Sequence, residues 1–278
     1  MKGIEKGVYI LPNLFTTGNL LFGFLAIVRA IQITLRSEEN FKICAIFIFI
    51  AAVFDMLDGR VARKTNTASK FGVEYDSLCD LVSFGLAPAI VVYLWALQSF
   101  ERFGWMGLFL YVACGALRLA RFNVQSSGLE KKHFQGLPIP MAAMMLVGAL
   151  LIWEGSVPNE SLFFQGDAET FVFILVYLLA FLMVSSIPYR GFKSVPLNRT
   201  VPFKYMLLAV IGLMFFALRP WWTLYGMGAI YLVSGPFEYF VLGHRSIAAI
   251  KKRLSKNKND KVENIVVFSK KSDHEKSS

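Results

Sequence analysis

Cysteine and charge are both scarce in this 278-residue chain. Its three cysteines, Cys44, Cys79 and Cys114, have no paired spacing, which argues against a disulfide framework and against a zinc site. Charged residues make up 17% of the chain, whereas apolar residues make up 55% and aromatic residues 15%. An average soluble domain carries roughly 25% charged residues. The composition therefore indicates an integral membrane protein.

Apolar runs long enough to cross ~30 Å of hydrocarbon recur along the chain. We expect eight such spans, at residues 12–35, 41–63, 71–97, 104–123, 138–155, 168–187, 203–218 and 221–243. They show no strand-like alternation, and a backbone in lipid must satisfy its own hydrogen bonds, so we expect all of them to be α-helices. The predicted fold class is all-α, a polytopic membrane protein whose transmembrane domain covers residues 1–245.

Basic residues dominate the charge of the chain, which has a net charge of +10. Of the 29 Lys and Arg residues, 24 fall on one set of alternate sides of the predicted spans and four on the other, with Arg29 inside the first span. The positive-inside rule then predicts an even number of spans with both termini in the cytoplasm. The charge thus favours contact with anionic lipid headgroups and no nucleic-acid partner. Residues 246–278 are expected to form a basic cytoplasmic tail that begins at the membrane surface and ends in disorder.

Four aspartates occur in the stretch "DMLDGRVARKTNTASKFGVEYDSLCD", inside or beside two predicted spans. Asp55 and Asp58 are three residues apart and project from one face of a helix. Asp76 and Asp80 are four apart and form a second stripe. The polar segment between the two pairs is expected in the cytoplasm. Two antiparallel helices joined there would bring the stripes face to face near the cytoplasmic membrane boundary.

Facing carboxylates repel one another unless they are protonated or bridged by cations. Hard divalent ions prefer oxygen ligands, and Mg²⁺ usually completes its shell with phosphate oxygens. Two such ions can activate the attacking and the leaving oxygen of a phosphoryl-type substitution. Small residues at Gly59, Ala62 and Gly72 would let a flat group approach the backbone, and Arg63 could neutralise a phosphate. The sequence therefore predicts a metal-dependent phosphoryl-group site that opens to the cytoplasm and to lipid.

Two other interpretations of the acidic residues remain open. The aspartates could pair with the neighbouring Lys and Arg residues as a juxtamembrane ion network, although three of them lie deeper along their helices than those bases easily reach. They could also form the translocation site of a cation transporter. A transporter would distribute its acids over more helices around a cavity at the membrane midplane.

The motif reads Asp58-Gly59-x2-Ala62-Arg63-x8-Gly72-x3-Asp76-x3-Asp80, with Asp55 three residues before it. It resembles the complete signature of the CDP-alcohol phosphatidyltransferase family, whose members are polytopic enzymes with a core of six transmembrane helices. The resemblance implies two bound ions, Mg²⁺ or Mn²⁺. It implies that the metals are held by Asp55, Asp58, Asp76 and Asp80, with Asp80 also the catalytic general base. It further implies that the nucleotide and phosphate site is formed by Asp58, Gly59, Ala62, Arg63 and Gly72.

Segments outside the motif indicate which alcohol would accept the phosphatidyl group. The stretches "LPNLFTTGNLLFGFLAI", "DLVSFGLAPA", "RLARFNVQ", "GLPIPMAA" and "SSIPYRGFK" resemble the phosphatidylserine synthase branch of the family. This resemblance implies a homodimer that transfers a phosphatidyl group from CDP-diacylglycerol to the hydroxyl of L-serine, giving phosphatidylserine and CMP. Glycerol 3-phosphate or inositol as acceptor, or an archaeal CDP-ether lipid as donor, remain alternatives with the same chemistry.

A pocket for serine needs a fixed cation for the carboxylate and acceptors for the ammonium group. Candidates at cytoplasmic helix ends are Arg118, Arg121, Asn123, Gln135, Arg190 and Lys193. Some of these could instead bind the pyrophosphate, and each basic one could simply extend to the membrane interface. Near the N-terminus, Asn13 and Thr16 either touch the nucleotide or cap a helix.

Overall fold

The computed structural model describes residues 2–38, 40–65, 69–126, 136–155, 168–187, 189 and 212–239. Every regular element in these residues is helical, which confirms the predicted all-α class. The chain divides into two compact units, Met1–Leu232 and Val233–Ser278, and the contacts described below lie within the first. The tail at 246–278 lies outside the described residues, so its expected properties and the domain boundary at residue 245 stay predictions.

The described residues form the following helical elements. In chain order they are α1 (Lys2–Leu35), α2 (Lys42–Thr65), α3 (Lys70–Asp80), the π-helix η1 (Leu81–Leu86), α4 (Ala87–Val92), the π-helix η2 (Tyr93–Leu97), the 3₁₀-helix η3 (Gln98–Phe100), α5 (Glu101–Ser126), α6 (Ile139–Gly155) and α7 (Ala168–Val184). Two further helices cover residues 212–218 and 220–239. Each of the eight predicted spans overlaps one of these helices or an unbroken run of them.

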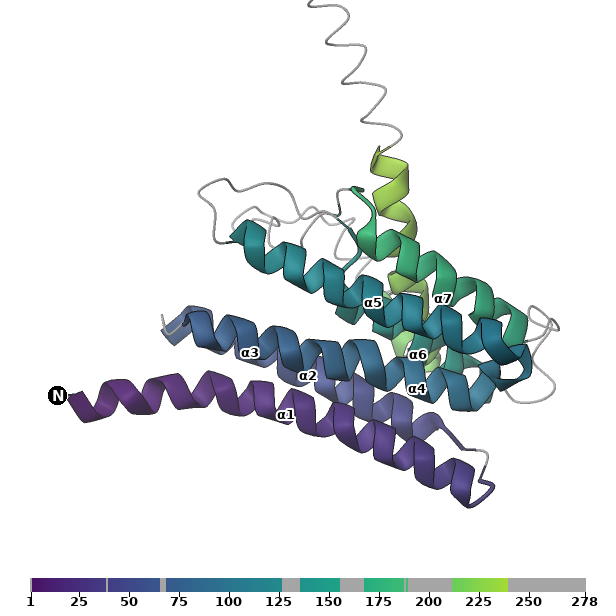
Figure 1. Ribbon diagram of the computed structural model, residues 1–278, viewed down its shortest axis with the longest axis horizontal. Coiled ribbons are helices and arrows are strands. Elements are labelled where there is room, and N and C mark those ends of the chain that lie inside the picture. Colours follow the sequence, from purple (N-terminus) through teal and green to yellow (C-terminus); the bar gives the residue numbers. More distant parts are fainter. Residues whose placement is uncertain are drawn as a thin grey trace, which may run out of the picture. The chain divides into compact units, whose positions relative to one another are not determined.

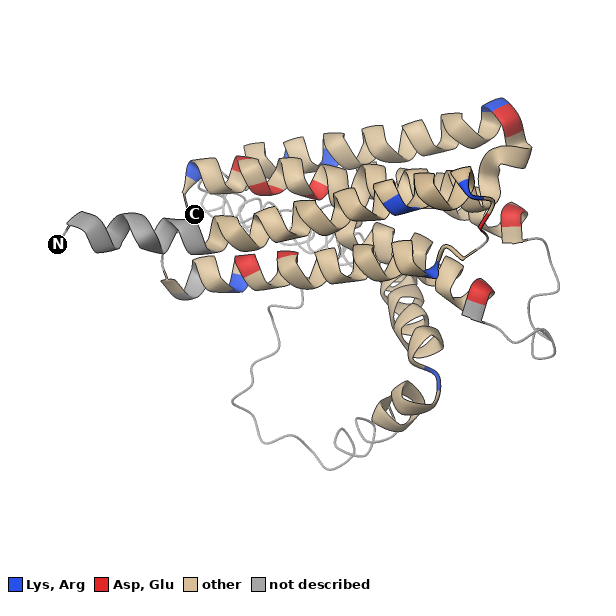
Figure 2. Ribbon diagram, turned by 90° about the horizontal axis from the view of Figure 1, so that it is seen from below, with Lys and Arg blue, Asp and Glu red and all other residues tan. Residues whose placement is uncertain are grey.

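Two helical stretches of the described residues, Pro12–Leu35 and Lys70–Val124, are long and apolar enough to cross a membrane by length and composition alone. Two apolar helices are shorter, Ile139–Glu154 and Ala168–Val184. Large apolar side chains stand on the outside of the bundle, among them Leu35 at 80% and Phe181 at 79% exposure. Figure 2 shows that most of each described helix carries no charge. Such surfaces suit hydrocarbon better than water.

Helix α1 packs along α2, and the run from α3 to α4 lies beside it (Figure 1). Both helices carry small residues that are fully buried, among them Ala26 and Ala30 on α1 and Ala45 and Ala51 on α2. Small side chains let membrane helices approach closely, so that backbone and side-chain contacts replace lipid contacts. Gly23 makes a similar approach to η1, because a Cβ atom there would lie 2.3 Å from Ser83 Oγ.

The π-helix η1 begins directly after Asp80, and Pro88 closely follows its end. Proline has no N–H, so Pro88 cannot donate to the carbonyl of Phe84 four residues earlier. The hydroxyl of Tyr111, from α5, donates to that carbonyl instead at 2.9 Å. Both Phe84 and Tyr111 are fully buried. This bond fixes α5 against the irregular stretch that follows the acidic motif.

The end of α7 is held by the segment that precedes α6. The N–H of Leu137 donates to the carbonyl of Leu182 at 3.0 Å, and the N–H of Gly136 donates to that of Ile187 at 2.9 Å. Gly136 has φ +83°, a left-handed conformation that favours glycine. From α5, both terminal nitrogens of Arg121 donate to the carbonyl of Val184 at 3.2 Å. The last carbonyls of α7 therefore have partners from two other parts of the chain.

Candidate metal and phosphoryl-transfer site

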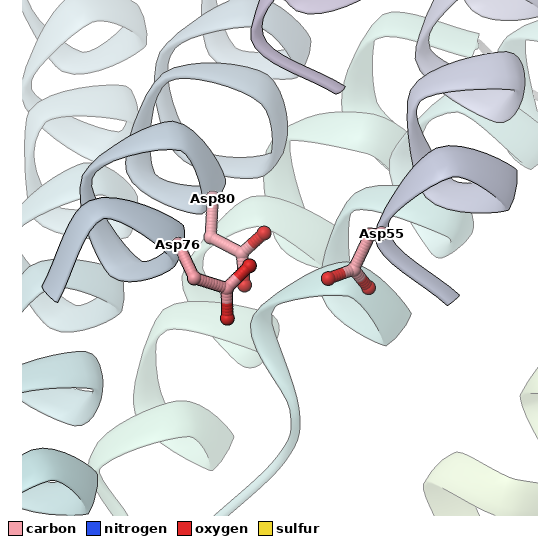
Figure 3. Close-up of side chains that lie close together, drawn as sticks. All are labelled: Asp55, Asp76 and Asp80. Carbon is pink, nitrogen blue, oxygen red and sulfur yellow. The ribbon is translucent and has the colours of Figure 1, made fainter. Parts of the chain in front are cut away.

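Three of the four aspartates meet in space. Asp55 comes from α2, and Asp76 and Asp80 come from successive turns of α3. One carboxylate oxygen of each lies within 4.8 Å of those of the other two. Figure 3 shows the side chains of Asp76 and Asp80 pointing from one helix toward Asp55 on another. The predicted face-to-face arrangement of the two helices is thus present for these three residues.

The start of α3 is fixed by a side-chain cap. Ser69 Oγ accepts a hydrogen bond from the N–H of Gly72 at 3.0 Å. This is the usual way in which serine satisfies a free amide in the first helical turn. A Cβ atom on Gly72 would lie 3.1 Å from Ser69 Oγ and 3.5 Å from Asn13 Oδ1. Gly72 therefore stands where the first turn of α3 meets the side chain of Asn13 on α1.

Helix α1 supplies hydrogen bonds to two of the aspartates. Thr16 Oγ1 lies 2.8 Å from Asp58 Oδ2, and Asn19 Nδ2 donates to Asp80 Oδ1 at 3.1 Å. Thr16, Asn19, Asp58 and Asp80 are all buried. The backbone of Asn19 is itself held, because Ser83 Oγ donates to its carbonyl at 3.0 Å. The orientation of Asp58 and Asp80 thus depends on a helix outside the acidic motif.

The donor set suits a hard divalent cation. Oxygen ligands from carboxylates are what such ions prefer, and Asp76 Oδ1 is buried without a hydrogen-bond partner among the described residues. No described side chain forms an ion pair within 4.0 Å with Asp55, Asp76 or Asp80. The side chains of Arg63 and Lys64 lie outside the described residues, so the ion-network interpretation stays a hypothesis. A partly buried group of carboxylates at these distances is stabilised by a cation.

The remaining residues of the motif lie on α2. Asp58 is not one of the three aspartates within 4.8 Å of one another, but it is close enough for its charge to act on them, and it bonds to α1. Gly59 and Ala62 are half-buried, on the turns that follow. Arg63 belongs to α2, but its side chain is outside the described residues, so its expected contact with phosphate stays a prediction.

The candidates for a serine pocket fall into two groups. Gln135, Arg190 and Lys193 lie outside the described residues, and their roles stay predictions. The other three, on α5, are described. Arg121 binds the end of α7 as given above. Asn123 Nδ2 lies 3.0 Å from both Glu74 Oε2 and Ser77 Oγ, which ties α5 to α3.

Arg118 differs from its neighbours on α5. Its Nε atom is buried and has no hydrogen-bond partner among the described residues. The residue as a whole is only partly buried. Its role in a serine or phosphate pocket therefore stays a prediction.

Sequence reasoning missed Asn19 and Ser83. A signal for Asn19 was present, since a polar side chain in an otherwise apolar span is costly unless it has a task. Its position three residues after Thr16 also puts both on one face of α1. Ser83 gave no comparable signal, because a single hydroxyl in an apolar helix is common.

Buried carboxylates from two helices, held by hydrogen bonds from a third within an apolar bundle, fit a membrane enzyme that transfers a phosphoryl group. The chain belongs to the CDP-alcohol phosphatidyltransferase family, whose family model matches residues 9–187. Enzymes of this family generally depend on divalent metal ions.

Curated relatives cover most of the chain. It is 36% identical over 235 residues to the CDP-diacylglycerol–serine O-phosphatidyltransferase of Helicobacter pylori, covering 84% of this chain and 93% of the relative. It is 36% identical over 243 residues to the enzyme of the same name from Methanocaldococcus jannaschii, covering 86% and 98%. The relative of that name from Bacillus subtilis is 36% identical over 184 residues, covering 66% of this chain and 92% of its own length.

Proposed function

We propose that the protein transfers a phosphatidyl group from CDP-diacylglycerol to the hydroxyl of L-serine, giving phosphatidylserine and CMP. The chemistry is supported by one observation above all, the three carboxylates of Asp55, Asp76 and Asp80 within 4.8 Å of one another at the positions of the family motif. The choice of serine is supported by the curated CDP-diacylglycerol–serine O-phosphatidyltransferases that align with most of the chain.

In this proposal, two Mg²⁺ or Mn²⁺ ions are held by Asp55, Asp58, Asp76 and Asp80. When bound, the ions would neutralise charge on the pyrophosphate and lower the barrier for attack at phosphorus. Gly59, Ala62 and Gly72 leave room for the nucleotide, and Arg63 pairs with a phosphate.

Asp80 is the proposed general base. Asn19 engages its Oδ1 atom, which leaves Oδ2 to take the proton of the serine hydroxyl. The serine oxygen then bonds to the phosphorus that carries diacylglycerol, the bond from that phosphorus to the CMP oxygen breaks, and CMP leaves with the electron pair. The buried position of Asp80 keeps bulk water from competing for the phosphatidyl group.

The remaining parts of the proposal concern the membrane. The asymmetry of Lys and Arg supports a site and both termini on the cytoplasmic side of eight spans, six of which form the family core. The family resemblance supports a homodimer. Protease accessibility in sealed vesicles would test the sidedness, and the mass of the purified protein in a defined detergent would test the dimer.

The direct test is CMP release by the purified full-length protein. The assay contains CDP-diacylglycerol with Mg²⁺ or Mn²⁺ and adds L-serine, glycerol 3-phosphate or inositol in turn. We expect release that requires serine, stops when the metal is removed by EDTA, and returns when the metal is restored. Release only with another alcohol would keep the family chemistry and refute the choice of acceptor.

The transporter interpretation has less support than the enzyme. The acids that meet come from α2 and α3 rather than from many helices around a central cavity. Metal flux into proteoliposomes that lack CDP-lipid would nonetheless contradict the enzyme proposal if it occurred without CMP release in the assay above.

A further inference from the structure

Asn19 is a buried amide on α1 that uses only half of its side chain. The residue is fully buried, with an exposed fraction of 0%. Its Nδ2 atom donates to Asp80 Oδ1 at 3.1 Å, whereas its Oδ1 atom is buried and has no hydrogen-bond partner among the described residues. A polar side chain in an apolar span is costly unless it has a task. The oxygen of Asn19 therefore needs a partner that the described side chains do not supply.

The charge of Asp80 determines which way the amide of Asn19 faces. An ionised carboxylate has no proton to donate, so the atom of Asn19 that faces Asp80 Oδ1 is the N–H group. The oxygen and the nitrogen of an amide share one carbon, so Asn19 Oδ1 lies at the same group of aspartates. Asp76, in that group, also has a buried oxygen without a partner in the described part of the chain. Two unpartnered oxygens thus occur at one site.

The main chain at Asn19 is held against η1. Ser83 Oγ donates to the carbonyl of Asn19 at 3.0 Å, and Ser83 is fully buried. One turn further along α1, Gly23 leaves the space that Ser83 occupies, because a Cβ atom there would lie 2.7 Å from Ser83 Cα. Since η1 begins directly after Asp80, the contact also fixes α1 beside that aspartate. The side chain of Asn19 is therefore held in place by the packing around it.

The unpartnered oxygen of Asn19 has the chemistry of a ligand for a divalent cation. Carboxylate and carbonyl oxygens, including those of asparagine, suit Mg²⁺ and Mn²⁺. The four aspartates of the motif carry four negative charges when ionised, which the two proposed divalent ions balance. A neutral amide oxygen adds a ligand without adding a charge that would repel the pyrophosphate of the substrate. A cation thus satisfies the oxygen of Asn19 and the aspartates together.

We propose that Asn19 Oδ1 is a neutral ligand of the divalent-metal site, supplied by α1 to an ion that Asp80 also binds. This inference rests on the proposed function, which assigns metal ions to the aspartates. It gives the two halves of one amide separate tasks, because the N–H group orients Asp80 and the oxygen binds the ion. Metal binding then also joins α1 to α3.

The test separates the two atoms of the amide. Asn19→Leu removes both the donor and the oxygen, whereas Asn19→Asp keeps an oxygen and loses the donor. Asn40→Leu is the matched control, since Asn40 is exposed beside the start of α2, at the other end of that helix from Asp55. The affinity of the full-length protein for Mn²⁺ is measured by electron paramagnetic resonance without substrate, and the melting temperature is measured with and without Mn²⁺.

We expect Asn19→Leu to weaken Mn²⁺ binding by about 10- to 100-fold, the usual effect of changing a residue that holds a metal site together. Asn19→Asp should bind Mn²⁺ at least as tightly as wild type, because a carboxylate oxygen replaces the amide oxygen and its charge attracts the cation. Asn40→Leu should match wild type. The rise in melting temperature caused by Mn²⁺ should be smaller in Asn19→Leu than in the other proteins.

Two results would overturn the inference. One is an Mn²⁺ affinity in Asn19→Leu equal to that of wild type. The other is an Asn19→Asp variant that binds Mn²⁺ as weakly as Asn19→Leu, because the N–H group that orients Asp80 would then account for the whole effect. If Asn19→Leu does not fold, as judged by its melting temperature, Asn19→Ser takes its place under the same two criteria, since its shorter side chain withdraws the oxygen from the site.

The same experiments distinguish this inference from the proposed function. Mn²⁺ binding is measured without CDP-diacylglycerol or an alcohol, so it does not depend on the acceptor. A wild-type protein that binds Mn²⁺ with the expected pattern in the variants, but releases no CMP with any alcohol, would refute the proposed function and leave Asn19 as a metal ligand.

Discussion

Thr16→Val is the substitution for which the structure allows the sharpest estimate. Thr16 Oγ1 lies 2.8 Å from Asp58 Oδ2, and the two residues are only 4% and 6% exposed. Valine has nearly the same shape as threonine but lacks the hydroxyl. A hydrogen bond to a charged group contributes about 1.5 to 3 kcal/mol, equivalent to roughly 10- to 150-fold in an equilibrium constant. We expect about a 10-fold loss of affinity for Mn²⁺ and for the CDP-lipid. This is the low end of the range, because the lost hydrogen bond also destabilises the protein without its ligands.

The neighbouring threonine provides the control. Thr17 is exposed, and its hydroxyl lies 2.7 Å from the carbonyl of Asn13 and 3.0 Å from the hydroxyl of Tyr75. Thr17→Val removes the same group one residue away but touches none of the aspartates, so affinities should change by less than about 3-fold. Mn²⁺ titration followed by electron paramagnetic resonance, together with the metal dependence of CMP release, measures the effect. Thr16→Ser should restore most of the affinity because serine keeps the hydroxyl.

Equal losses in Thr16→Val and Thr17→Val would refute this reasoning, because the exposed bond would then matter as much as the buried one. An unchanged Mn²⁺ affinity in Thr16→Val would refute the inference that α1 orients Asp58 for metal binding. A lower melting temperature without a change in affinity would assign Thr16 to stability alone.

Five further substitutions, at four positions, test the assigned roles and the fold. Asp80→Asn should abolish turnover yet leave CDP-lipid binding measurable, whereas Asp58→Asn should lose metal and nucleotide together; equal, modest effects of both on CMP release and ligand binding would contradict the two roles. Asn19→Leu should lower kcat more than it raises KM for the donor, and Asn19→Asp should be worse because it puts a like charge beside Asp80; an Asn19→Asp variant as active as Asn19→Leu would count against a direct contact. Gly136→Ala should destabilise the protein by about 2 kcal/mol or more, since a Cβ there would lie 2.3 Å from the carbonyl oxygen of Met183 at a left-handed φ; a melting temperature equal to that of wild type would exclude this strain.

The three-aspartate group was predictable because helical periodicity is rigid. Residues four apart are offset by only about 40° around a helix, so Asp76 and Asp80 had to share a face. Asp55 and Asp58 are three apart and are offset by about 60° in the other sense. That difference turns Asp58 toward Thr16 on α1, while Asp55 faces α3. The sequence pattern put all four on facing stripes, and Asp58 differs from the other three in its hydrogen bond with Thr16.

The roles of the basic residues on α5 could not be separated in the same way. Arg118 and Arg121 lie one turn apart and have similar neighbours in the sequence. What distinguishes them is the end of α7, whose carbonyls need donors and take those of Arg121. That contact joins residues more than sixty positions apart in the chain. No local pattern predicts it.

The proposed metal ligands and the side chains that orient them lie between Thr16 and Ser83, within the stretch matched by the family model. Asp80 is where three helices meet, because Asn19 on α1 donates to it while it forms the three-aspartate group with Asp76 on α3 and Asp55 on α2. A substitution on α1 can therefore change how the proposed base is held without altering any carboxylate that the phosphoryl transfer requires.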